Sequence, residues 1–168
     1  MAVRIDSELR ALGNSEWAQK SRRFFKTGEG GYAATDEFVG IPMPLLRAEV
    51  KKRFPLPLKT ISDLMPSSCH EVRLFALLTL VRCYERQDNK KEIVSTYLSN
   101  LEHVNNWDLV DCSAYKILGP YYLERDKSVL FELAVSQSLW ERRVAIITTL
   151  HFIKNAHVQT TLELLDLL

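Results

Sequence analysis

The sequence predicts an all-α fold, an α-α superhelix made of antiparallel helix pairs. Three observations predict it. Apolar residues recur at helical spacing along most of the chain, alternating strand-like stretches are nearly absent, and a short helix followed by a long one recurs. The chain has 168 residues, of which 46% are apolar and 26% charged, so a single packed domain over 1–168 is expected.

The N-terminal third is expected to form one helix followed by a long loop. Ser7 has the side chain of an N-cap, and helical spacing follows it to about Phe25. Residues 26–44 are rich in glycine and proline and predict a loop, and long loops inside compact domains are often functional. Pro44 suits the first turn of the next helix, and a short helix is expected over 58–65.

Three long helices in the rest of the chain resemble one another. They are expected over 70–85, 106–118 and 140–153, and shorter amphipathic helices precede them over 58–65, 89–101 and 127–136. Each long helix opens with an acidic residue, and these residues lie 37 and 33 positions apart. A helix pair that recurs at this interval is typical of a HEAT-like or armadillo-type solenoid.

The last segment, 158–168, predicts one more short helix. Its ending, TTLELLDLL, is apolar, whereas a solenoid normally finishes with a polar cap. We therefore expect either a domain that is truncated at its C-terminus or a tail that packs against another surface.

Composition and spacing exclude several kinds of site. Cys69, Cys83 and Cys112 show no CxxC spacing, and the charged N-terminus resembles no export signal, so reduced thiols of a cytoplasmic protein are expected. No run of eighteen apolar residues predicts a membrane span. The four histidines lie apart, and the glycines follow no strand, so neither a metal nor a cofactor is expected.

Charge is distributed unevenly along the chain, although the net charge is only +1. Residues 1–60 contain 11 Lys/Arg against 7 Asp/Glu, a net of +4, and residues 61–168 contain 11 against 14, a net of −3. A basic face at one end would suit a phosphate backbone. The pattern alone does not distinguish such a face from an ordinary solvated surface.

Asp111 breaks the pattern of the long helices. When their opening acidic residues are aligned, the third position after them holds Leu74, Asp111 and Val144. A carboxylate is costly to bury where its equivalents are aliphatic, unless it is paired or faces a cleft. Trp107 lies four residues earlier, on the same helical face, and Arg143 opens the next long helix. We expect these three side chains to converge on the concave surface.

Structural roles remain open for the same residues. Trp107 could be an aromatic residue that packs between repeats. Asp111 and Arg143 could form an ordinary ion pair between neighbouring helices. Arg73 and Arg142 are expected to be solvated or to take part in a ladder of charges.

Two strings in the second half, NNWDLVDCSAYKILG and SQSLWERRVAIITTLHFIK, resemble the core of the AlkD-like DNA alkylation repair family. FFKTGEGGYAATDEFVGIPMP and HEVRLFALLTL are also similar to that family, and the order is preserved over nearly the whole chain. The family consists of bacterial glycosylases built from HEAT-like repeats. The resemblance implies a concave DNA-binding face and double-stranded DNA with alkylated bases as the partner. We expect a cytoplasmic, bacterial monomer.

The resemblance also places roles on individual residues. The pocket tryptophan of the family falls on Trp107, its essential aspartate on Asp111, and the arginine after its LW dipeptide on Arg143. The residues expected to contact DNA are Arg142, Phe24, Lys26 and Arg23. The family has a further tryptophan in a helix that would begin after residue 168, and this chain lacks it.

The activity implied is hydrolysis of the N-glycosidic bond of cationic N3- or N7-alkylated purines. Such a base leaves as a neutral molecule, so no general acid is needed. Asp111 would stabilise positive charge on the deoxyribose and orient the attacking water. Trp107 would stack on the lesion, and Arg143 would hold a phosphate. The alternative is a non-catalytic HEAT-like scaffold that binds DNA or a protein.

Overall fold

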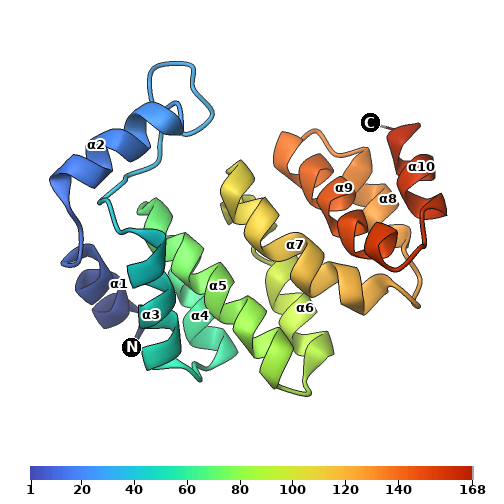
Figure 1. Ribbon diagram of the computed structural model, residues 1–168, viewed down its shortest axis with the longest axis horizontal. Coiled ribbons are helices and arrows are strands. Elements are labelled where there is room, and N and C mark those ends of the chain that lie inside the picture. The colour runs from blue at the N-terminus through green and yellow to red at the C-terminus, as the bar shows by residue number, and fades with distance from the viewer. Residues whose placement is uncertain (168) are drawn as a thin grey trace. The chain divides into compact units, whose positions relative to one another are not determined.

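Helices make up the regular structure of the computed structural model, which describes residues 1–167 (Figure 1). Within these residues the β structure is limited to one isolated bridge, between Glu37 and Cys69. The predicted all-α fold class is therefore confirmed. Internal contacts divide the chain into two compact units, Met1–Cys83 and Tyr84–Leu168. The single-domain organisation stays a prediction.

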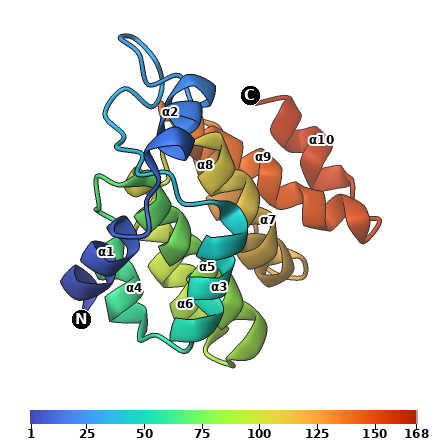
Figure 2. The same cartoon turned by 60° about the vertical axis from the view of Figure 1, so that its left-hand side comes forward.

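The first unit contains four helices and most of a fifth. They are α1 (Ala2–Arg10), α2 (Ser15–Phe24), α3 (Met43–Arg53), α4 (Leu58–Leu64) and α5 (His70–Arg86). Helix α1 packs against α4, and Figure 2 shows the two lying together near the N-terminus. The core of this unit is apolar, and its largest fully buried side chains include Phe38, Leu46, Ile61 and Phe75.

The single helix predicted from Ser7 to about Phe25 is wrong. Two helices occupy this stretch, and Ser7 lies inside α1 instead of capping it. Residues 11–14 separate the two helices, and a Cβ atom at Gly13 would lie 2.5 Å from the carbonyl oxygen of Val39. Asn14 then caps α2, since its side chain accepts hydrogen bonds from the backbone N–H groups of the second and third residues that follow it. A contact with a distant loop therefore overrides local helical spacing.

The predicted long loop is observed, and it packs on the start of α5. Glu71, which is buried, accepts hydrogen bonds from the backbone N–H groups of residues 39–41, the shortest at 2.7 Å from Gly40. Arg73 is also buried and lies 2.8 Å from Asp36. The expectation that Arg73 is solvated is therefore wrong, because this arginine neutralises a carboxylate of the loop.

The second unit contains the remaining helices. They are α6 (Lys90–Leu98), the 3-10 helix η1 (Leu101–His103), α7 (Trp107–Tyr122), α8 (Ser128–Ala134), α9 (Leu139–Lys154) and α10 (Gln159–Leu165). Helix α6 packs on α7, α8 and α10 pack on α9, and α7 lies along α9 (Figure 1). Two helix pairs thus stack through their long members, as neighbouring repeats do in an α-α superhelix.

Helix α7 continues beyond its predicted end at residue 118. Gly119 and Pro120 would ordinarily end a helix, yet both lie inside α7, and Leu123 still donates a hydrogen bond to the carbonyl of Gly119. Gly119 is buried against the neighbouring helix α9. Glycine here permits a close approach of two helices and does not act as a C-cap.

The repeat is real, but its register differs from the one given by the acidic residues. Buried hydroxyl groups recur at Thr79, Ser113 and Thr148, and each donates to the carbonyl oxygen four residues earlier, at 2.8, 2.5 and 2.7 Å. These residues lie 34 and 35 positions apart, in place of 37 and 33. Arg73 and Arg142 fit this register, since each donates at 2.7 Å to the carbonyl six residues before it.

Candidate functional site

An ion pair joins the two long helices of the second unit. Nε of Arg143 donates to Oδ1 of Asp111 at 2.9 Å, and Nη2 donates to Oδ2 at 2.7 Å. This bidentate geometry is the strongest that an arginine and a carboxylate form. The hydrogen bond to Asp111 raises the pKa of Arg143, so the guanidinium keeps its proton. The ion pair that the sequence left open as a structural alternative is therefore formed.

The pair is not buried. The exposed fraction is 36% for the side chain of Arg143 and 35% for that of Asp111. In the corrected register Asp111 is equivalent to Leu77 and Ile146, in place of Leu74 and Val144. Asp111 therefore still occupies a position where the other long helices have aliphatic residues, and its carboxylate remains accessible to solvent.

Trp107 is the first residue of α7 and is half-buried. It lies one turn before Asp111, on the same face of the helix, as the sequence predicts. Asn106 precedes it as the N-cap residue, and its side chain is fully buried. Neither polar atom of this amide has a hydrogen-bond partner among the described residues. Buried side-chain amides rarely lack hydrogen-bond partners. Asn106 was not identified from the sequence, where its only signal is the Asn-Asn dipeptide before Trp107.

A buried hydroxyl pair lies behind the site and was also missed. The Tyr97 hydroxyl lies 3.0 Å from the Oγ atom of Ser113, which in turn donates to the carbonyl of Leu109. Burial raises the pKa of Tyr97, and the negative charge of Asp111 adds to the effect. This pair ties α6 to α7 two residues beyond Asp111. Nothing in the spacing of Tyr97 distinguishes it from an ordinary core aromatic.

Arg142 binds the protein's own backbone. Its Nη1 atom donates to the carbonyl oxygens of Ser136 at 2.7 Å and Gln137 at 3.1 Å. Arg142 therefore fixes the turn that precedes α9, a role that the sequence did not predict. Its Nε and Nη2 atoms are not used in these bonds, and a contact of Arg142 with DNA stays a prediction.

The DNA-binding candidates of the first unit gather at the C-terminal end of α2. Phe24 is 66% exposed, and its ring lies edge-on to that of Phe25 with centroids 5.1 Å apart. Arg23 and Lys26 are exposed beside it, and Lys26 has a positive φ of 52° where the helix ends. The structure thus assembles one aromatic and two basic residues here, and separately assembles Trp107, Asp111 and Arg143 in the second unit.

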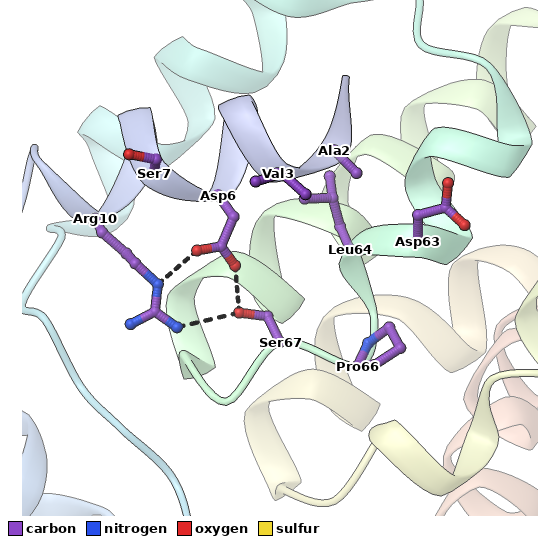
Figure 3. Close-up of a pocket in the computed structure, with 9 residues that line it drawn as sticks. All are labelled: Ala2, Val3, Asp6, Ser7, Arg10, Asp63, Leu64, Pro66 and Ser67. Atoms are coloured by element: carbon purple, nitrogen blue, oxygen red, sulfur yellow. Dashed lines mark hydrogen bonds and ion pairs between the residues drawn. The ribbon is translucent and has the colours of Figure 1, made fainter.

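A cavity of about 440 Å³ lies between α1 and α4 in the first unit (Figure 3). Three of its polar residues, Asp6, Arg10 and Ser67, are engaged with one another. Asp6 accepts bonds of 2.5 Å from both Arg10 and Ser67, and Arg10 also lies 2.5 Å from Glu37. The rest of the lining is mainly apolar. Asp63, which pairs with Lys59 at 2.9 Å, and Ser7 complete the polar part of the lining.

Residues 1–167 contain no group of three or more His, Cys, Asp or Glu side chains placed to hold a metal ion. Over the same residues, every helix is too short or too polar to cross a membrane.

These observations define an all-α helical-repeat protein with an accessible Arg–carboxylate pair one turn from a tryptophan. Residues 5–168 match the model of the family described as DNA alkylation repair enzyme, and the chain belongs to that family. The AlkD-like resemblance is thereby confirmed, and membership supports a role in DNA alkylation repair. Neither the curated proteins nor the solved structures contain a match to this chain.

Proposed function

We propose that this protein is a DNA glycosylase that removes cationic N3- or N7-alkylated purines, with Asp111 as its catalytic carboxylate. The observation that carries the proposal is the bidentate Asp111–Arg143 pair, which fixes a carboxylate between two helices and leaves 35% of its side chain exposed. A carboxylate held in place in this way can act on charge that develops nearby without first reorganising.

The chemistry needs little more than such a carboxylate. The N-glycosidic bond breaks, its electron pair moves to the cationic base, and the base leaves neutral. Positive charge then develops on the deoxyribose, where the negative charge of Asp111 stabilises it. A water molecule attacks the anomeric carbon, and its proton passes to Asp111 or to solvent.

The ion pair with Arg143 is compatible with this role. A carboxylate has about four lone-pair sites, and the two bonds from Arg143 leave the others for a water molecule. The guanidinium carries five N–H donors, so it can hold a DNA phosphate while it still orients Asp111. Such a phosphate contact positions the DNA without reading its sequence.

Other residues supply binding. The face of Trp107 attracts a cationic base or sugar, an interaction of about 0.5–2 kcal/mol depending on desolvation. Arg142 in the second unit, and Arg23 and Lys26 in the first, are further candidates for phosphate contacts, and Phe24 offers an exposed aromatic face. The target is double-stranded DNA that carries alkylated bases, since the family implies a DNA substrate.

A second candidate is the non-catalytic scaffold. The same ion pair favours it, because Arg143 already neutralises Asp111, and a net charge of +1 gives little attraction for DNA. On this alternative the pair only joins α7 to α9, and its loss would affect stability alone.

Replacement of the carboxylate separates the two candidates. Asp111→Asn keeps the shape of the side chain but removes its charge. We expect release of 7-methylguanine from alkylated duplex DNA to fall by at least about a hundredfold, the scale for loss of one electrostatic stabiliser. Duplex affinity should stay nearly unchanged.

The matched control is Glu124→Gln, which changes an acidic side chain that is 75% exposed and lies outside the site. It should release 7-methylguanine like the unaltered protein. Unchanged release by a folded Asp111→Asn variant would overturn the catalytic assignment.

Removal of the arginine tests the phosphate contact. Arg143→Ala should weaken binding to duplexes of any sequence and reduce the slope of log affinity against log salt by about 0.9, as for one lost phosphate contact. Arg143→Lys, which keeps the charge but loses the fork geometry, should retain most of the slope. If Arg143→Ala lowers only the thermal stability, the scaffold candidate gains.

A further inference from the structure

Helix α7 approaches α9 closely at Gly119. A Cβ atom at this position would lie 2.4 Å from Cβ of His151 and 3.1 Å from the backbone oxygen of Thr148. Real Cβ atoms essentially never approach another atom within 3.0 Å, and the first neighbour is the rigid base of a side chain. Any residue other than glycine must therefore push the two helices apart.

This contact and the ion pair share one register. Gly119 lies eight residues after Asp111, and His151 lies eight residues after Arg143, so 32 residues separate the partners in both contacts. Eight residues advance an α-helix by about 12 Å, a little over two turns. The two helices thus run side by side in the same direction. The Asp111–Arg143 salt bridge connects them, and the Gly119–His151 contact lies about two turns further along.

We propose that Gly119 is a positioning residue that sets the separation of α7 and α9 and thereby the bidentate geometry of the Asp111–Arg143 pair. A methyl group at 119 must move from 2.4 Å to an ordinary contact distance, which requires a displacement of about 1 Å. Packed helices transmit such a displacement along their length because protein interiors have few voids to absorb it. Two simultaneous hydrogen bonds between Arg143 and Asp111 tolerate less change than a single charge contact.

The inference about the pair stands on the packing alone, and its consequence for excision rests on the proposed function. A misplacement of about 1 Å in a reacting group can lower a rate by roughly a hundredfold. Gly119→Ala should therefore lower kcat for release of 7-methylguanine by about tenfold to a hundredfold. KM should change less than kcat, because Arg143 keeps its charge for the phosphate contact while Asp111 loses its fixed position.

The test compares three variants of the full chain. Gly119→Ala introduces the clash. The double variant Gly119→Ala with His151→Gly relieves it, because position 151 of α9 then has no Cβ atom. Gly119→Ala with Leu150→Gly places glycine at an adjacent, 41% exposed position of α9 and controls for the helix-weakening effect of glycine. Alanine is itself a better helix former than glycine, so helix propensity cannot explain a loss in Gly119→Ala.

The main readout is the NMR resonance of the Arg143 Nε–H group, assigned by its absence in Arg143→Lys. We expect this resonance to shift or broaden in Gly119→Ala, to return toward its original position with His151→Gly, and not to return with Leu150→Gly. An unshifted resonance in folded Gly119→Ala overturns the proposal. If Gly119→Ala does not fold, recovery of fold and resonance by His151→Gly supports the proposal, and failure to recover overturns it.

Excision provides the second readout and separates the two ideas. If the unaltered protein releases no 7-methylguanine while the resonance behaves as described, the proposed function fails and the positioning role stands. If the unaltered protein is active and Gly119→Ala keeps both an unshifted resonance and its full kcat, the positioning role fails and the proposed function stands.

Discussion

Glu71 illustrates how this protein stabilises a buried charge. Its carboxylate accepts hydrogen bonds from the backbone of residues 39–41, where Gly40 has a φ of +82°. A Cβ atom at Gly40 would lie 2.2 Å from the carbonyl oxygen of Asn14, so glycine is required for the close approach as well as for the conformation. Glu71 thus joins the long loop to the start of α5.

Loss of this carboxylate should be costly. Glu71→Ala leaves buried backbone N–H groups without an acceptor, and we expect the free energy of unfolding to fall by about 3 kcal/mol. Urea denaturation followed by circular dichroism measures it. Glu16→Ala is the control, because Glu16 is 74% exposed and its pair with Lys20 should contribute almost nothing. Equal losses in the two variants would contradict the role given to Glu71.

At the scale of the helix, local signals determine where elements end only when tertiary contacts agree with them. Asn14 caps α2 with bonds of 3.0 and 3.1 Å to the N–H groups of Glu16 and Trp17. Gly119 and Pro120 ordinarily signal the end of a helix, and yet both lie within α7. The Asn14 side chain sets the start of α2. Packing against α9 overrides the helix-ending signal of Gly119 and Pro120.

The cap gives a prediction for α2. Asn14→Ala should lower the free energy of unfolding by about 1 kcal/mol, the usual cost of losing an N-cap acceptor. Asn14→Ser should retain most of it, because a hydroxyl also accepts the bond. Chemical denaturation of both variants checks this. A loss of the same size in Asn14→Ser would point to the packing around Asn14 in place of the cap.

At the scale of the whole molecule, paired surface carboxylates each make a small contribution to how stability responds to acid. Hydrogen bonds from Arg53, Lys20, Arg10 and Ser128 lower the pKa values of Glu8, Glu16, Glu37 and Asp126, respectively. The folded state therefore binds fewer protons than the unfolded state as these groups titrate, and its stability rises with pH. The contribution is fully present above the unfolded pKa values and is lost as pH falls through the folded ones.

We therefore expect the thermal unfolding midpoint to decline as pH falls below about 4.5, the ordinary pKa of glutamate. Because these groups are largely exposed, 1 M NaCl should reduce the size of the decline by screening their pairs. Scanning calorimetry at both salt concentrations would measure it. A decline of equal size at 1 M NaCl would assign acid sensitivity to buried groups.

Much of the fold could be predicted because helix formation depends on short-range spacing. The three long helices and their shorter partners were predicted within a few residues, apart from the extension of α7. The first helix and the repeat register were not predicted correctly. The first predicted helix is interrupted near Gly13, which lies against Val39. The repeat register follows from buried hydroxyl groups, and the spacing of residues does not reveal that they are buried.

For the candidate site, the sequence by itself determined which residues differ from the repeat and which helical face carries them. Asp111 and Trp107 share a face because residues four apart lie one turn apart, whatever surrounds the helix. Only the tertiary structure decided that Arg143 meets Asp111 in a bidentate pair and that Arg142 turns to its own backbone. The physical reason is that the pair depends on the separation of α7 and α9, and two residues two turns away, Gly119 and His151, set that separation.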